Sequence, residues 1–151
     1  MRIIESLADM PALVGQEVAV SPWLTITQEQ VNQFAQATGD HQWIHVDVER
    51  AKAGPFGAPI AHGFLTLSLL PKFFESSMEI RNTRMGVNYG LNKVRFTSPV
   101  PVGSRLRARL KLLACEPLEG NGVQMAWNVT IEREGSDKPV CIAESLSRRF
   151  A

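Results

Sequence analysis

The sequence predicts a single α+β domain over residues 1–151, in which an antiparallel sheet surrounds one apolar helix. Segments of alternating hydrophobicity follow one another from about residue 86 with no helix between them, which is typical of antiparallel strands. A run at residues 63–74 is apolar nearly all round, which indicates a helix covered on every side. The length of 151 residues suits one domain.

The composition excludes several classes of protein. Hydrophobic residues make up 44% of the chain and charged residues 21%, as in ordinary globular proteins. A formal net charge of +1 argues against nucleic acid as a partner, since that binding depends on neutralised phosphates. The longest apolar run, residues 63–70, is far shorter than the ~20 residues of a membrane span. Acidic Glu5 and Asp9 do not fit a signal peptide, so we expect a soluble, cytoplasmic protein with no membrane partner.

The first predicted elements are one or two short strands within residues 17–27, where Pro22 marks an edge or a kink. A helix follows at residues 28–38. Thr27 and Gln30 have the spacing of a capping box at its start, and Gly39 is suited to the left-handed conformation that ends a helix.

Residues 39–62 form a long irregular stretch that contains all three histidines, and one turn of helix is expected at residues 47–53. Loops of this length in a compact domain are usually functional. In the apolar helix that comes next, Pro71 predicts a kink or a new turn.

Four strands are predicted in the second half of the chain. Apolar and basic residues alternate along residues 105–112, and the basic side chains are expected to form a solvated face. Gly120-Asn121-Gly122 indicates a hairpin. The other strands are expected near residues 87–96, with a β-bulge at Asn92, and near residues 123–131 and 140–146. The two cysteines, Cys115 and Cys141, indicate no disulfide framework.

Asp40 and His45 are the first candidates for chemistry, because a carboxylate and an imidazole in one ordered loop can share a water molecule. The spacing alone fits two structural roles as well: Asp40 as a turn residue, and His62 as a buried histidine whose ring bonds to a loop carbonyl. Together with His41 these residues include a two-histidine, one-carboxylate set that a metal could use. Spacing does not supply the geometry of such a site, and we predict no metal.

Two segments resemble a known family. FAQATGDHQWIHVD at residues 34–47 and PIAHGFL at residues 59–65 are similar to the signature of the MaoC-like hydratases and dehydratases. This family includes the (R)-specific enoyl-CoA hydratases and a nodulation-protein-N-like branch. Val94-Arg95-Phe96 and the turn at residues 99–103 match as well, so the resemblance spans about residues 17–148.

The resemblance implies the hot-dog fold, with the sheet wrapped around the helix that begins at Gly63, and a homodimer whose sheets are continuous. It implies a lyase that reversibly hydrates trans-2-enoyl-CoA to (R)-3-hydroxyacyl-CoA without a cofactor, since the substrate itself carries CoA. Asp40 and His45 match the catalytic pair. Gly63 matches the residue whose N–H polarises the thioester carbonyl, and Ser68 matches a position in the polar network of the site.

The chain departs from the family at Gln42 and Trp43, where Asn-Pro is usual; we expect both residues at the substrate, with an effect on acyl-chain preference. Lys93 and Arg95 are expected near the mouth of the site, where they would contact the phosphates of CoA. Two other functions stay open. One is a hot-dog acyl-CoA thioesterase, in which the carboxylate activates water toward the carbonyl. The other is a catalytically weak module that binds acyl thioesters.

Overall fold

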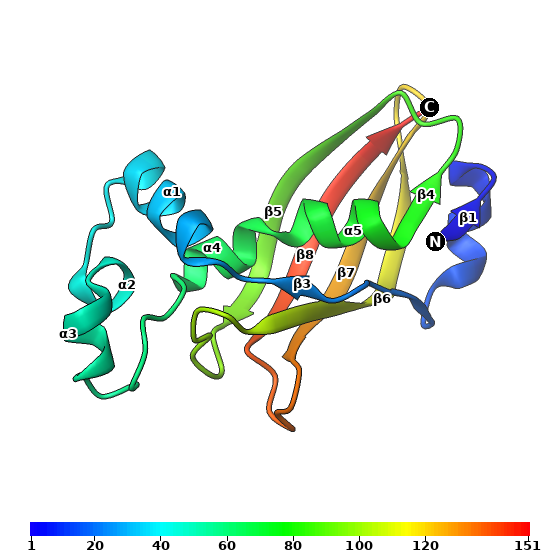
Figure 1. Cartoon of the computed structure of the whole chain (residues 1–151). Coiled ribbons are helices and arrows are strands. Elements are labelled where there is room, and N and C mark those ends of the chain that lie inside the picture. The colour runs from blue at the N-terminus through cyan, green and yellow to red at the C-terminus, as the bar shows by residue number, and fades with distance from the viewer.

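The computed structural model describes residues 1–151 and contains a curved, antiparallel six-stranded sheet (Figure 1). This confirms the predicted α+β class. The strand order is β2-β6-β7-β8-β5, and β3 pairs with β6. Their bounds are β2 (Glu17–Val20), β3 (Leu24–Thr25), β5 (Met85–Arg95), β6 (Arg105–Leu118), β7 (Gly122–Arg133) and β8 (Cys141–Phe150).

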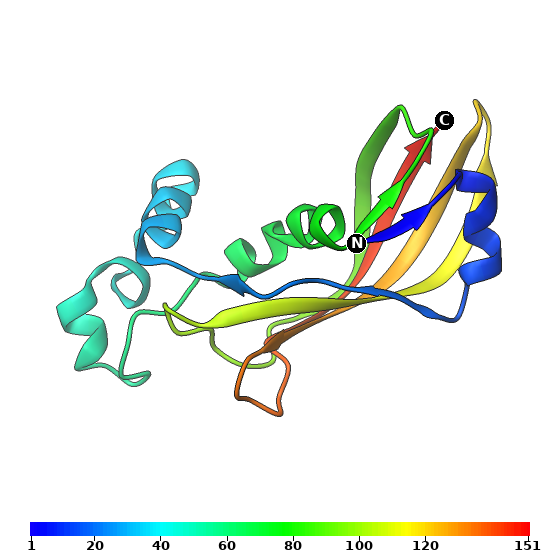
Figure 2. The same cartoon turned by 45° about the vertical axis from the view of Figure 1, so that its right-hand side comes forward.

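The helices α4 (Gly63–Ser68) and α5 (Leu70–Ser77) lie across the concave face of this sheet, which curls around them (Figure 2). The alternation in the strands supplies the contact surface, because every second side chain points to the same face. Phe73 of α5 is 1% exposed, and Phe74 packs edge-on against Trp127 of β7 with ring centroids 5.1 Å apart. The fully buried residues of β6 are Leu106, Ala108, Leu110 and Leu112.

The expectation that this helix is buried on every side was wrong. Phe64 is 69% exposed, and Ser68, Pro71 and Lys72 are exposed as well. The sheet covers only part of the helix circumference, because its strand β5 is an open edge. The predicted break is confirmed: a new helix begins after Leu69 with Pro71 in its first turn, where the missing N–H removes no helical hydrogen bond.

The predicted helix at residues 28–38 is confirmed as α1 (Gln28–Thr38). Thr27 Oγ1 accepts a hydrogen bond from Gln30 N at 3.2 Å, and Gln30 Oε1 accepts one from Thr27 N at 2.9 Å. Gly39 ends the helix with φ of 82°, a conformation in which a β-carbon is unfavourable. The capping box and the glycine together determine where the following loop begins.

Two short helices follow, α2 (Trp43–Val46) and α3 (Val48–Lys52), so the single turn expected at residues 47–53 covers only the second. A four-residue helix gives almost no periodic signal, which explains why α2 was not predicted. The three helices α1, α2 and α3 project beyond one end of the sheet (Figure 1).

The sheet also contains the details that the sequence predicted. Register shifts between β5 and β8 fall at Asn88/Gly90 and at Leu91/Lys93, and the second is the bulge expected at Asn92. Gly120 and Asn121 both have positive φ in the hairpin. The basic face of β6 is solvated, as predicted, with Arg105 and Lys111 exposed. Its three arginines form ion pairs with carboxylates of β2, of β7 and of the residue after β7: Arg105 with Glu134, Arg107 with Glu132, and Arg109 with Glu17 and Glu132.

Three elements were not predicted: β1 (Arg2–Ile4), the 3₁₀ helix η1 (Leu7–Leu13) and β4 (Met78–Ile80). The strands β1 and β4 pair in parallel although residues 5–77 lie between them, and a contact between such distant segments leaves no local pattern. Both cysteines are free, as expected. Among the helices, none combines the length and the apolar character needed to cross a membrane.

The cap of α1 gives a first prediction. Thr27→Ala should lower the free energy of unfolding by about 1 kcal/mol, because it removes the side-chain acceptor of the Gln30 amide. Thr27→Ser keeps that acceptor and is the matched control. Urea denaturation followed by circular dichroism measures both variants. Equal stability of Thr27→Ala and the wild type would contradict this role for the cap.

Candidate active site

The imidazole of His62 lies at the centre of the candidate site. Its ring stacks on His45 of α2 with centroids 3.9 Å apart and an interplanar angle of 24°, and it packs against Phe34 of α1 at 4.8 Å. Its Nε2 lies 3.0 Å from the carbonyl oxygen of Asp40. One side chain at the start of α4 thus holds together α1, α2 and the loop between them.

The tautomer of His62 follows from these contacts. A carbonyl oxygen can only accept, so Nε2 carries the hydrogen, and Nδ1 is a buried acceptor with no hydrogen-bond partner. Burial lowers the pKa of His62 below the usual value of 6.5, with a smaller contribution from neighbouring His45. The ring is therefore held neutral. The sequence-based interpretation of His62 as a buried histidine bonded to a loop carbonyl is confirmed.

The ring of His45 is held in a defined orientation. It is 6% exposed, and its Nδ1 lies 2.6 Å from the carbonyl oxygen of Ile60, so Nδ1 is the protonated nitrogen. The backbone of His45 is held too, because its carbonyl accepts a hydrogen bond from Gln28 Nε2 at 2.9 Å. Nε2 makes no hydrogen bond within the chain and is available to accept a proton.

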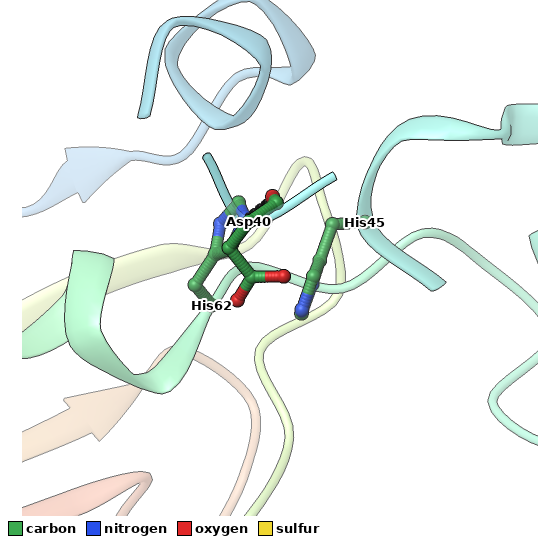
Figure 3. Close-up of side chains that lie close together, drawn as sticks. All are labelled: Asp40, His45 and His62. Atoms are coloured by element: carbon green, nitrogen blue, oxygen red, sulfur yellow. Dashed lines mark hydrogen bonds between the residues drawn. The ribbon is translucent and has the colours of Figure 1, made fainter. Parts of the chain in front are cut away.

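Asp40 brings a carboxylate to the two imidazoles. One oxygen of Asp40 and one ring nitrogen each of His45 and His62 all lie within 4.8 Å of one another, and Figure 3 shows the three side chains converging. Asp40 is exposed, and its Oδ1 accepts a long hydrogen bond of 3.4 Å from Gln42 N. A carboxylate with only one long hydrogen bond, close to an imidazole nitrogen that has none, can bind and activate one water molecule.

A cavity of about 360 Å³ opens beside this group and is lined by His45, Gly63 and Thr66 together with aromatic and apolar residues. Gly63 is the first residue of α4, where the amide hydrogens have no acceptor within the helix. A β-carbon at Gly63 would lie 2.8 Å from the ring of Phe96, so the close approach of that ring requires glycine. The cavity places an imidazole, a free amide and an apolar wall in contact with one space.

Two predicted contact residues lie elsewhere. Trp43 does not line this cavity: its ring packs under Arg50 at 4.3 Å and against Gly54. Ser68 is exposed beside a second, larger cavity along β5, and its Oγ donates to the Leu65 carbonyl at 2.7 Å. Gln42 is exposed and precedes α2, and the structure gives its side-chain amide no hydrogen bond.

Lys93 and Arg95 are both exposed at the end of β5. Arg95 donates to the neighbouring Val94 carbonyl, and the next residue, Phe96, lines the cavity beside His45. Both cations therefore lie on the strand that leads to the cavity.

Asp40, His45 and His62 are also the residues that could hold a metal ion. In each histidine, however, one ring nitrogen is already bonded to a carbonyl. The expected absence of a metal stays a prediction, which elemental analysis of the purified protein tests.

Comparison with known proteins agrees with the fold described above and identifies the family of this chain. The chain matches the MaoC like domain over residues 9–134. It is 56% identical over its full length, and the full length of the relative, to 3-hydroxyacyl-thioester dehydratase Z of Mycobacterium tuberculosis. It is 50% identical to nodulation protein N of Rhizobium meliloti, covering 94% of this chain and 89% of that one. The chain therefore belongs to the MaoC-like dehydratase family.

Solved structures confirm the hot-dog fold. R-hydratase PhaJ1 from Pseudomonas aeruginosa has a TM-score of 0.67 and 28% identity, with 89% of this chain and 79% of that chain covered. A protein from Archaeoglobus described as a monoamine oxidase regulatory protein has a TM-score of 0.78 at 22% identity, over 99% and 97% of the two chains. The second likeness concerns the fold alone.

The buried, neutral His62 gives a prediction for stability against pH. Because its folded pKa is lowered, the unfolded chain binds the proton more readily, and stability should fall as pH decreases below about 6.5 toward the folded pKa. His62→Gln should reduce this loss between about pH 7.5 and about pH 5. Exposed His41→Gln is the control and should keep the wild-type slope. The midpoint of urea denaturation, measured across this pH range, tests the prediction. A midpoint that falls with decreasing pH as steeply in His62→Gln as in the wild type would contradict it.

Proposed function

We propose that this protein reversibly hydrates trans-2-enoyl-CoA thioesters to (R)-3-hydroxyacyl-CoA. The observation that carries the proposal is the approach of the Asp40 carboxylate to the ring of His45, whose Nε2 makes no hydrogen bond within the chain, beside a cavity lined by His45 and Gly63. A dehydratase name among the full-length relatives and an R-hydratase among the structural neighbours support the reaction type. The proposed reaction needs no cofactor, because the thioester already acidifies its α-carbon.

The pair would act through a single water molecule. The carboxylate of Asp40 and Nε2 of His45 each accept one of its hydrogens, which leaves an oxygen lone pair to attack the β-carbon. The proton taken from water is then returned to the α-carbon, so that the elements of water are added without any other reactant. The bond from His45 Nδ1 to Ile60 keeps Nε2 in the accepting state.

Gly63 would polarise the thioester carbonyl. Negative charge develops on that oxygen as the β-carbon is attacked, and a free amide hydrogen stabilises it. Gly63 faces the same cavity as His45, so one bound thioester can contact both. Lys93 and Arg95 would then meet the CoA phosphates at the mouth of the site, as charge-assisted partners of the substrate.

A thioesterase is the second candidate, because the same carboxylate could direct water at the carbonyl carbon. The unbonded nitrogen of His45 favours hydration, because removing a proton from water and placing one on the α-carbon are two transfers that use two groups. Loss of the enoyl-thioester absorbance without release of free thiol distinguishes hydration from hydrolysis. If crotonyl-CoA binds and neither product forms, the protein is better described as a module that only binds acyl thioesters.

We also propose that two chains pair along β5. Alternate apolar residues of this edge strand are exposed: Met85 by 46%, Val87 by 45%, Tyr89 by 52% and Leu91 by 44%. An open edge with an apolar face is a surface that natural proteins pair or cover. A second copy of β5 would extend the sheet and cover the open side of α4 and α5.

The proposed catalytic pair gives a prediction for enzyme activity. Asp40→Asn and His45→Gln should each lower the rate of crotonyl-CoA hydration by ~10²–10⁴-fold, since each removes a positioned proton acceptor. The double variant should be little slower than either single one, because the two groups act on one water. The loss of enoyl absorbance measures all three.

Asp47→Asn is the matched control, since that carboxylate caps α3 through the Arg50 amide and should not affect turnover. Near-normal hydration in either Asp40→Asn or His45→Gln would exclude this assignment of the pair. Losses that multiply in the double variant would show that the two residues do not share a water.

The edge strand gives the second prediction. The wild type should be a dimer, with a mass in light scattering of twice 16.7 kDa. Leu91→Glu should shift it toward the monomer, because a carboxylate would be buried in the interface. Val20→Glu on β2, at the opposite edge of the sheet, is the control and should stay dimeric. A monomeric wild type would contradict the paired sheet.

A further inference from the structure

The hydroxyl of Thr66 is buried without a hydrogen-bond partner. Thr66 lies on α4 and is 2% exposed, and its Oγ1 makes no hydrogen bond within the chain. A buried polar group left unpaired costs about 1–3 kcal/mol. Such groups are uncommon and usually have a functional reason.

Other helical hydroxyls of this protein behave differently. Thr38 donates to the Phe34 carbonyl, Ser68 to the Leu65 carbonyl and Ser77 to the Phe73 carbonyl, each at 2.7 Å. This bond to the preceding turn is the usual arrangement for serine and threonine within a helix. Thr66 does not make it, although the carbonyl of His62 is within reach of its own amide at 3.2 Å. The hydroxyl of Thr66 therefore has its hydrogen available for another acceptor.

The position of Thr66 shows where that acceptor would lie. Its side chain lines the 360 Å³ cavity that also contains His45 and Gly63. Thr66 follows Gly63 by three positions, so both project from the same face of α4, with Thr66 about one turn deeper. A thioester whose carbonyl meets the Gly63 amide would extend its β-carbon toward Thr66 and His45.

We infer that the Thr66 hydroxyl donates a hydrogen bond to the oxygen that is added at the β-carbon. This oxygen belongs to water in the hydration direction and is the 3-hydroxyl in the reverse direction, so the inference rests on the proposed function. Asp40 and His45 would accept the two hydrogens of the water, Thr66 would donate to one lone pair, and the other lone pair would attack. Thr66 is thereby a residue that recognises (R)-3-hydroxyacyl thioesters.

Kinetics in both directions test this role. In the hydration direction the bond is made to water and not to crotonyl-CoA, so Thr66→Val should keep the KM of crotonyl-CoA. The kcat of hydration should fall about tenfold, the effect of one neutral hydrogen bond, because the attacking water is less well positioned. For (R)-3-hydroxybutyryl-CoA the bond exists in both ground and transition state, so KM should rise about tenfold at constant kcat. The two changes agree with the reaction equilibrium, which no variant can alter.

Two controls separate contact with substrate from packing. Thr66→Ser keeps the hydroxyl and should restore both constants. Ser77 is a buried helical hydroxyl outside this cavity, and it is bonded to the Phe73 carbonyl; Ser77→Ala should lose stability and keep both KM values. Thr66→Val should be at least as stable as the wild type, because it removes an unpaired buried hydroxyl.

Three outcomes would overturn the inference. A wild type without hydration or dehydration activity would reject the proposed function and this role with it. An active wild type with unchanged constants in Thr66→Val would reject the role of Thr66 alone. Equal changes of KM for both substrates in a destabilised Thr66→Val, without rescue by Thr66→Ser, would assign Thr66 to packing.

Discussion

The stack of His62 on His45 is the contact on which the candidate site depends. His62 begins the central helix, and its ring simultaneously meets α1 through Phe34, α2 through His45 and the Asp40 loop through a carbonyl. Aromatic rings in such contact gain both buried area and a preferred geometry. The helices that carry the catalytic candidates project beyond the sheet, so this contact and the bond from His45 to Ile60 connect them to the core.

Because of this packing, the imidazole ring of His62 is neutral. Two protonated imidazoles stacked at 3.9 Å would repel each other, and burial lowers the pKa of His62. Each histidine donates one N–H to a carbonyl, which leaves Nε2 of His45 and Nδ1 of His62 as bare acceptors. A neutral His62 leaves no permanent positive charge next to the ring of His45.

Local patterns predicted most of the fold. The capping box at Thr27 and the left-handed Gly39 gave the bounds of α1, and the phase slip at Asn92 gave the bulge in β5. Burial was less well predicted. The apolar run at residues 63–74 suggested a helix covered all round, yet Phe64 is exposed, because a run of apolar residues does not show which of its faces the rest of the chain covers.

The sequence by itself determined the class of fold, the proximity of Asp40 to His45, and Gly63 at the start of the apolar helix, because these depend on local conformation and on two short motifs. Only the tertiary structure decided the surroundings of His62, Thr66 and Trp43. His62 gains its role from Phe34 and Asp40, which lie 28 and 22 residues earlier. In the sequence Thr66 is a polar residue within an apolar run, and nothing there shows the cavity that it lines. Trp43 packs on Arg50 rather than at the cavity, since side-chain direction depends on helices that fold against each other.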